Sequence, residues 1–260
     1  MNTTPTVVVH RDADVLAQAV AARLITKLAD VQAAQGQASV VLTGGRGGIA
    51  TLAAIAGSPA HAAVDWSALD VWWGDERFLP SGDPERNETQ ARAALLDHVP
   101  VDPARIHVMP AADGDLADQP ELAAERYADE FAAFVEASGH TGRAPFDVLL
   151  LGVGPDGHVA SLFPEHAALH DDRAVVAVRG APKPPPIRLS LSLSTIAEAD
   201  EVWLVVAGAD KAPAVRLALS GAGAVQVPAA GAHGRRATRW LLDRTAASEL
   251  PPGLERIASP

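Results

Sequence analysis

Short apolar runs that alternate with longer, alanine-rich stretches are the feature that most constrains the fold of this chain. Nine runs have the length and composition of β-strands, at 6–9, 39–43, 69–73, 105–108, 147–151, 174–178, 187–193, 202–207 and 238–242. Two of the intervening stretches, 12–34 and 121–137, repeat apolar side chains at roughly helical spacing. Strands that alternate with helices predict an α/β fold, with a Rossmann-like, mostly parallel, twisted sheet flanked by helices. Such sheets bind ligands in the loops at the carboxyl ends of their strands.

The length of the chain fits a single domain that spans residues 1–260. With 260 residues, of which 48% are apolar, the chain is long enough to bury a sizeable core. The proline-rich stretch APKPPP, at 181–186, is short and is followed by further apolar strands, so it predicts a loop inside the domain. The sequence contains no cysteine, which excludes disulfides and cysteine-ligated metal sites.

The net charge of −11 argues against nucleic acid and anionic membranes as partners, because both need a basic face. An acidic protein that binds a small anion must gather a few cations locally. The first residues lack the basic and apolar segments of a signal peptide, and no apolar run approaches the length of a membrane span. We therefore expect a cytoplasmic protein, a monomer or a weak homo-oligomer, that binds a small molecule.

The segment VVLTGGRGGIATL places a glycine-rich loop between a buried strand and a helix. Gly44 and Gly45 let backbone N–H groups approach a ligand closely, and the helix N-terminus that follows favours an anion. Arg46 adds a positive charge. These features predict a phosphate-binding loop, and the alternative is a flexible surface turn. The loop is not of the Walker type, because no Gly-Lys-Ser/Thr follows it.

Three charged residues follow the strand LDVWW and a single glycine. They are Asp75, Glu76 and Arg77. We expect Glu76 to lie in a solvated turn, whereas Arg77, beside two carboxylates, is a candidate for a positioned cation. Asn87 is expected to cap the helix that begins in ERNETQAR.

The string DVLLLGVGPDGHVASLFPEH carries a G-x-G-x-x-G pattern after an apolar strand, formed by Gly152, Gly154 and Gly157. Dinucleotide-binding proteins share this pattern, but here Pro164 limits the following helix to about two turns. Asp156 would also place a carboxylate among the N–H groups meant for a pyrophosphate. We therefore expect a tight loop that presents Asp156 and His158 at the start of a short helix. The carboxylate can orient the imidazole, which suits general-base chemistry near neutral pH.

Two further cations lie where strands and helices begin. Arg188 opens the alternating strand IRLSLSL, and Lys211 lies at a helix start after the strand VWLVVA. A cation at a helix N-terminus opposes the helix dipole at a cost of about 0.3–1 kcal/mol, which a bound anion offsets. Lys211 is therefore either a phosphate ligand or a solvated lysine.

Four strings, in this order, resemble the 6-phosphogluconolactonase family: WWGDERFLP…ERN, DVLLLGVGPDGHVASLFP, KPPPIRLSLSL and VWLVVAGADKA. The resemblance covers nearly the whole chain. It implies a NagB-like, isomerase-type α/β fold with a small additional lobe that contains β-strands. It also implies hydrolysis, without cofactor or metal, of 6-phospho-D-glucono-1,5-lactone to 6-phospho-D-gluconate in the oxidative pentose phosphate pathway.

The resemblance further implies a role for individual residues. His158 matches the general base of the family, Asp156 its neighbouring acid and Arg77 the arginine of the GDER motif. The phosphate site that it implies comprises Gly44, Gly45, Arg188 and Lys211. Two positions depart from the usual pattern, because Arg46 stands in place of a Ser or Thr, and Val159 in place of a Thr. Each departure removes a hydroxyl that could donate a hydrogen bond.

These residues suggest a mechanism without a covalent intermediate. His158 is expected to take a proton from a water that attacks the lactone carbonyl, while Asp156 holds the imidazole tautomer. The backbone N–H groups of the turn, with Gly154 and Gly157, are expected to stabilise the oxyanion at a helix start, assisted by Arg77.

Two other functions remain open on the same fold. One is a hexosamine-phosphate isomerase or deaminase, and the other is a non-catalytic sugar-phosphate sensor. Ser161 is expected to pack or cap, because no G-x-S-x-G elbow surrounds it. His166 and His170 have the spacing of metal ligands but no clear third ligand, so we expect no metal there.

Overall fold

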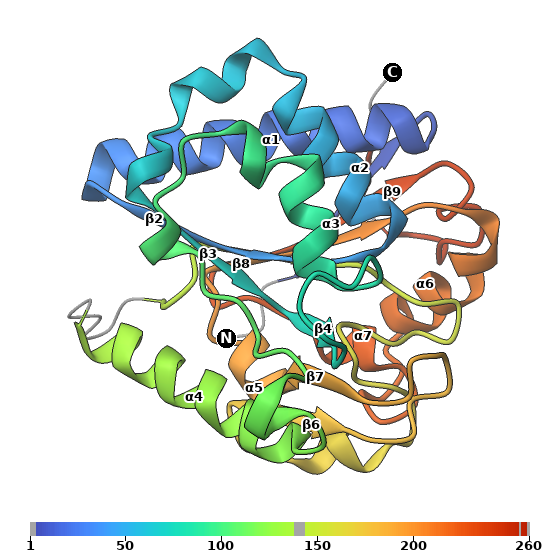
Figure 1. Ribbon diagram of the computed structural model, residues 1–260. Helices are drawn as coiled ribbons and strands as arrows, with labels where there is room; N and C mark the ends of the chain where they lie inside the picture. Colours follow the sequence, from blue (N-terminus) through green and yellow to red (C-terminus); the bar gives the residue numbers. More distant parts are fainter. Residues whose placement is uncertain (1–3, 138–143, 255, 259–260) are drawn as a thin grey trace.

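The computed structural model describes residues 4–137, 144–254 and 256–258, which form a main parallel sheet and a small antiparallel one (Figure 1). The main sheet has seven strands in the order β10-β1-β9-β8-β5-β2-β3, and every neighbouring pair is parallel. Its strands are β1 (Thr6–His10), β2 (Ala38–Leu42), β3 (Leu69–Trp73), β5 (Val148–Leu151), β8 (Glu201–Val206), β9 (Ala237–Asp243) and β10 (Arg256–Ala258). The predicted α/β fold with a mostly parallel sheet is confirmed.

The chain reverses its direction across the main sheet after β3. From β2 it crosses to the edge strand β3, and it then returns to β5 and continues through β8 to β9. The loops that follow β2 and β5 therefore diverge at the carboxyl edge of the sheet. Open α/β sheets bind ligands at such a switch point, because the diverging loops leave a crevice there.

Helices cover both faces of the main sheet. In Figure 1, α1, α2 and α3 lie on one side of the sheet, and α4 and α5 lie on the other. The helices are α1 (Ala13–Gln35), α2 (Gly45–Ala56), α3 (Asn87–Ala94), α4 (Pro120–Ala137), α5 (Leu193–Ile196), α6 (Ala212–Leu219) and α7 (Pro228–Gly231). The Asp12 side chain caps α1 by accepting a hydrogen bond from the Val15 N–H at 2.8 Å. The two helices predicted at 12–34 and 121–137 are thus confirmed, with no end shifted by more than one residue.

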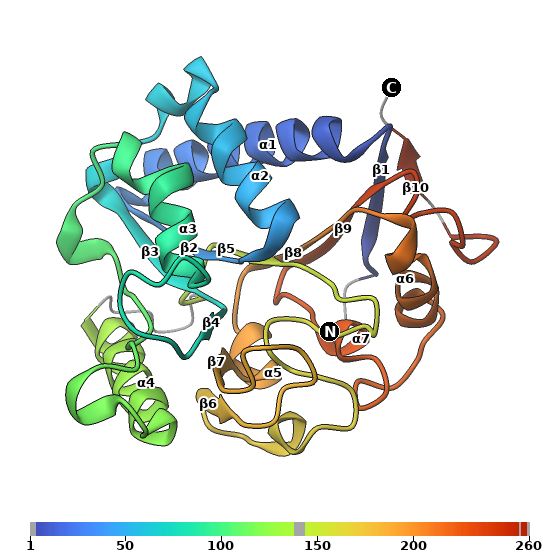
Figure 2. The same ribbon diagram turned by 45° about the vertical axis from the view of Figure 1, so that its right-hand side comes forward.

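The small sheet lies below the carboxyl edge of the main sheet (Figure 2). Its strands are β4 (Asp75–Arg77), β7 (Arg188–Leu191) and β6 (Val175–Val178), antiparallel and in that order. Only Gly74 separates β4 from the end of β3, so the small sheet is tied directly to the main one. The register pairs Arg77 with Arg188, which brings both cations to the same edge. The small lobe with β-strands that the resemblance implied is confirmed.

The prediction of a strand at 105–108 is wrong. Residues Pro103–Arg105 form a 3-10 turn, and only Ile106 pairs with β3, through a single parallel bridge to Val71. The alternation of polar and apolar side chains that suggested a strand has another cause. Arg105 and His107 turn toward Asp70 of β3, at 2.7 Å and 3.3 Å, while the backbone leaves the sheet.

The core is built from the buried strands and three fully buried tryptophans. Trp72, Trp73 and Trp203 are each 1% exposed, as a structural role for Trp72 and Trp73 requires. All four residues of β5 are buried, which is typical of a central strand covered on both faces. Among the described residues, no helix is both long enough and apolar enough to cross a membrane.

Candidate active site

A cavity of about 530 Å³ opens at the carboxyl edge of the main sheet. The loops after β2, β5 and β8 line it, together with β4, β7, the last residue of β9 and the start of α1. Most of the predicted site residues line this cavity: Gly44, Gly45, Arg46, Arg77, Gly154, His158, Arg188 and Lys211. Asp156 and Gly157 belong to the same turn as His158. The sequence-derived site residues therefore lie together, although they span more than half of the chain.

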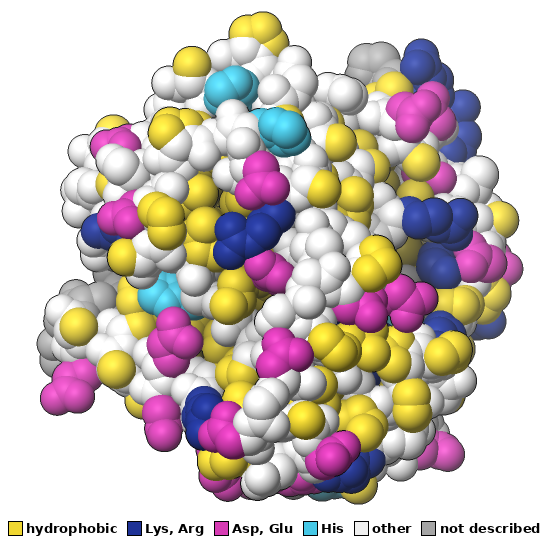
Figure 3. All heavy atoms as spheres, viewed as in Figure 1, with side chains coloured by type: hydrophobic (Ala, Val, Ile, Leu, Met, Phe, Trp, Pro, Cys, Tyr) yellow, Lys and Arg dark blue, Asp and Glu magenta, His cyan; other side chains and the backbone are white. Residues whose placement is uncertain are grey.

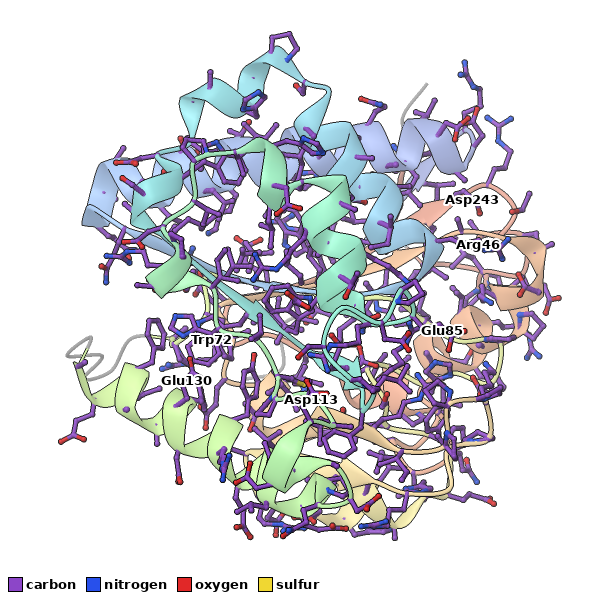
Figure 4. The ribbon with its side chains drawn as sticks, in the orientation of Figure 1. Arg46, Trp72, Glu85, Asp113, Glu130 and Asp243 are labelled. Carbon is purple, nitrogen blue, oxygen red and sulfur yellow. The ribbon has the colours of Figure 1, made fainter. Side chains whose placement is uncertain are left out.

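The glycine-rich loop forms the N-terminus of α2, as predicted. Gly44 is the N-cap, and α2 begins at Gly45 with a φ of +76°, a conformation that favours glycine. A Cβ on Gly44 would lie 1.9 Å from Oδ1 of Asn87, so no larger residue fits there. The first N–H groups of a helix have no partner within the helix, and here they border the cavity. The Arg46 side chain is exposed beside them, and Figure 4 shows it on the same side of the molecule as Asp243.

His158 and Asp156 form a hydrogen-bonded pair, which we call the dyad. Nδ1 of His158 lies 2.5 Å from Oδ1 of Asp156. Burial alone would raise the pKa of Asp156, but the hydrogen bond and charge of His158, with the Lys183 ammonium, hold it well below its usual range. The imidazole also packs on the ring of Phe163, with 4.6 Å between centroids. The side chain of His158 is therefore fixed in orientation, with one nitrogen committed to a carboxylate.

The predicted oxyanion role of Gly154 and Gly157 is not supported by the geometry. Gly154 donates its N–H to the carbonyl of His158, and Gly157 donates its N–H to the carbonyl of Gly154, each at 2.9 Å. Both groups are therefore used within the turn. The short helix expected after His158 is also absent, because the chain continues through a bridge between Val159 and Leu162. No helix dipole reinforces this turn.

Glu76 is not solvated, as the sequence suggested, but fully buried. Its carboxylate accepts hydrogen bonds from the N–H groups of Asn87 and Glu88, at 2.6 Å and 2.9 Å, and faces Arg86 at 3.7 Å. Burial raises the pKa of Glu76 to about 6, against the opposing charge of Arg86. Glu76 thus supplies the cap for α3 from a distant strand.

Asn87 is the first residue of α3 rather than its cap, because Glu76 already holds its N–H. Its side-chain amide instead donates to the backbone carbonyl of Asp75 at 2.8 Å. Asp75 is buried, and its carboxylate accepts a hydrogen bond from Ser161 at 2.7 Å. Asp75 therefore links the start of α3 to the segment that carries the dyad, and Ser161 has the structural role that was expected.

The cations of the cavity are anchored by neighbouring groups. Arg77 donates to the backbone carbonyl of Glu85, and Lys211 pairs with Asp210 at 2.7 Å. Arg188 is buried, and its guanidinium donates to three backbone carbonyls of the proline-rich loop. Lys211 precedes α6 as its N-cap, as predicted. On the face drawn in Figure 3, Lys and Arg side chains are scattered among Asp and Glu.

Three charged residues that line the cavity, Lys183, Asp243 and Asp14, were not predicted from the sequence. Lys183 lies 3.7 Å from the dyad carboxylate, and Asp243 holds the N–H of Gly208 at 3.2 Å. The signal for Lys183 was its place just before the proline run, which stiffens the chain that presents it. His166 and His170 lie outside the cavity. Within residues 4–137, 144–254 and 256–258, no group of three or more His, Asp or Glu is placed to hold a metal ion.

Comparison with known proteins identifies the family of this chain. Residues 11–240 match the family described as glucosamine-6-phosphate isomerases/6-phosphogluconolactonase. The chain is 61% identical over its full length to the full-length 6-phosphogluconolactonase of Streptomyces coelicolor. It is 46% identical to that of Mycobacterium tuberculosis, over 92% of this chain and 96% of the relative. The structure of 6-phosphogluconolactonase from Trypanosoma brucei, 27% identical, superposes with a TM-score of 0.77 over 96% of this chain and all of that one. The chain therefore belongs to the glucosamine-6-phosphate isomerase/6-phosphogluconolactonase family.

Proposed function

We propose that this protein is a 6-phosphogluconolactonase, which hydrolyses 6-phospho-D-glucono-1,5-lactone to 6-phospho-D-gluconate in the pentose phosphate pathway. The observation that carries the proposal is the dyad, in which His158 is paired with Asp156 and lines a cavity bordered by cations and by the N-terminus of α2. The family membership, and the name of the relative that is 61% identical, support the same reaction. Water is the only co-substrate that this reaction needs.

In the proposed mechanism, His158 acts as a general base. Nδ1 faces Asp156, so Nε2 is the nitrogen left to take a proton from water as the water oxygen attacks the lactone carbonyl. The carbonyl carbon becomes tetrahedral, and its oxygen carries the negative charge. When the carbonyl re-forms, the bond to the ring oxygen breaks, and the imidazolium returns its proton to that oxygen. Asp156 holds the imidazole in the required tautomer and stabilises the imidazolium.

The phosphate group would be held at the glycine-rich loop that follows β2. The first N–H groups of α2, at Gly44 and Gly45, would act with Arg46 and Lys211 as its ligands. Arg188 would contribute charge from β7, although most of its hydrogen bonds hold the proline-rich loop. Binding of the phosphate would hold the lactone carbonyl near His158, so that part of the binding energy is used to orient the substrate for reaction.

Since Gly154 and Gly157 use their N–H groups within the turn, oxyanion stabilisation falls to a side chain. Arg77 is our candidate, because it lines the cavity from β4 and its backbone is paired with that of Arg188. A guanidinium held in a partly buried site can stabilise developing negative charge without reorganising.

A direct assay tests the proposed function against its closest alternative. Glucose 6-phosphate dehydrogenase would generate the lactone, and excess 6-phosphogluconate dehydrogenase would report the product through a second NADPH. We expect the protein to accelerate the second NADPH well above the spontaneous rate. In parallel, ammonia release from glucosamine 6-phosphate would be measured. Ammonia release without lactone hydrolysis would assign the deaminase function instead, and activity on neither substrate would favour a sugar-phosphate sensor.

The cellular setting of the enzyme is also part of the proposal. A chain without cysteine fits a reducing compartment, which supports a location in the cytoplasm. The oligomeric state that we propose is a monomer or a weak homo-oligomer. Size-exclusion chromatography with light scattering would measure the oligomeric state.

A further inference from the structure

Lys183 is a cation beside the dyad for which the proposed mechanism has no role. Its Nζ lies 3.7 Å from Oδ1 of Asp156, the same oxygen that accepts the hydrogen bond of His158. The side chain lines the cavity and is 45% exposed, so it reaches Asp156 from the solvent side. One carboxylate oxygen therefore lies between an imidazole and an ammonium group.

The backbone that carries Lys183 is held in place by Arg188. Nη2 of Arg188 donates to the carbonyls of Lys183 and Pro184, at 3.1 Å and 3.0 Å, and Nε donates to that of Pro185 at 3.1 Å. Arg188 itself is 7% exposed and lies 6.0 Å from the ring of Phe163, on which His158 also packs. The loop that presents Lys183 is thus fixed to the same packing unit as the dyad.

We propose that Lys183 is a positioning residue that balances the charge of Asp156 and so sets the pH range in which His158 acts as a base. This inference rests on the proposed function. Asp156 alone would favour an additional proton on the imidazole, since an opposite charge stabilises the protonated form. The ammonium of Lys183 opposes that effect, because it adds a positive charge next to the pair. The enzyme would then keep His158 available as a base at lower pH than the dyad alone allows.

Other charged groups border the cavity, but they are unchanged by a substitution at Lys183. Asp75, Arg77 and Arg188 line the cavity from the small sheet, and Arg46, Lys211, Asp243 and Asp14 line it from the strands, loops and helices of the main sheet. The low pKa of Asp156 has His158 and Lys183 as its charged causes, which supports a local effect of Lys183 on this pair.

The test compares Lys183→Met with the wild type across a range of pH. Met keeps a similar length and apolar stem but removes the charge. Remaining lactone would be trapped with hydroxylamine, so that the readout does not depend on coupling enzymes. We expect the acidic limb of kcat/KM to move to higher pH by about half a unit to one unit, with a smaller change on the plateau. Lys183→Arg should restore the wild-type limb.

A matched variant and a second readout separate this inference from the proposed function. Lys211→Met removes a cation from the phosphate side, so it should raise KM and leave the acidic limb in place. NMR titration of the His158 ring in wild type and Lys183→Met measures the coupling without any substrate, and its midpoint should move in the same direction as the limb. If the limb of Lys183→Met stays in place, or if the NMR midpoint does, the inference is wrong. Failure of the wild type to hydrolyse the lactone would overturn the proposed function, while the NMR titration would still test the coupling.

Discussion

At Gly154 the backbone passes so close to the dyad that no side chain fits. A Cβ at this position would lie 2.0 Å from Nδ1 of His158 and 2.3 Å from Oδ1 of Asp156. Non-bonded atoms do not approach a Cβ this closely, so an alanine there would force the dyad to move. The glycine therefore has a functional reason that differs from dinucleotide binding and from oxyanion stabilisation. It leaves space for the hydrogen bond between the imidazole and the carboxylate.

Gly154→Ala should lower kcat strongly while the protein stays folded. The displaced pair would lose its orientation toward the attacking water, and a shift of about 1 Å can cost on the order of 10²-fold in rate. Gly223→Ala is the matched control, since a Cβ there meets nothing within 4 Å. Steady-state kinetics and thermal unfolding of both variants check the prediction. Wild-type activity in Gly154→Ala would show that the dyad geometry does not control the rate.

The three-residue strand β4 organises the site at the scale of elements. Asp75 holds Ser161 and the Asn87 side chain, Glu76 caps α3, and Arg77 borders the cavity. Successive side chains of a strand point to opposite faces, but here both faces are covered, since Asp75 and Glu76 are both buried. Each of them meets a partner from another segment, which is how a buried carboxylate is tolerated. The small sheet, α3 and the dyad segment are therefore joined through one short strand.

Glu76→Ala should destabilise the protein by roughly 3–5 kcal/mol, because it removes a buried carboxylate that faces Arg86, leaving only Glu88 at 3.9 Å, and it uncaps α3. Glu85→Ala alters an exposed glutamate in the segment between β4 and α3, and it should change the free energy of unfolding by less than about 0.5 kcal/mol. Urea unfolding of both variants measures the two values. Equal stability of the two variants would contradict the structural role of Glu76.

At the scale of the whole molecule, a cluster far from the cavity ties α4 to the edge of the main sheet. His107 lies between Glu130 of α4 and Asp70 of β3, at 2.7 Å and 3.3 Å, and stacks on Trp72 with 3.9 Å between ring centroids. Figure 4 shows Trp72 and Glu130 together on the side away from Arg46. Burial alone would lower the pKa of His107, but its hydrogen bonds to the two carboxylates outweigh burial and raise it.

A raised pKa in the folded state makes this contribution to stability strongest at low pH. The stabilisation by His107 is complete below the ordinary His pKa of 6.5, and it is lost as pH rises through the raised pKa of the folded state. Glu130→Gln should therefore destabilise the protein by about 0.5–1 kcal/mol near pH 6, and by less near pH 9. Asp129→Asn, which removes a neighbouring exposed charge of α4, should show no such pH dependence. Urea unfolding at both pH values measures the loss of stability in each variant. A loss in Glu130→Gln that grows with pH would contradict the stabilising role of the His107 pair.

The sequence predicted the parallel sheet and several of the residues that line the cavity, because both depend on local patterns. Apolar runs mark buried strands, and the loops that follow β2, β5 and β8 carry Gly44, His158 and Lys211. What it could not predict depends on contacts between distant segments. Glu76 resembles a surface charge until Arg86 and the start of α3 fold over it. The N–H groups of Gly154 and Gly157 were assigned to a ligand because their use within the turn is visible only in three dimensions.

Central to this account is the claim that His158 takes the proton from the attacking water. The most direct measurement is kcat for lactone hydrolysis by the wild type, His158→Ala and the control His170→Ala, which alters an exposed histidine outside the cavity. General-base catalysis contributes about 10²–10⁴-fold, so His158→Ala should lose activity by that factor, with KM little changed and His170→Ala unaffected. Activity of His158→Ala within a few-fold of the wild type would contradict the account.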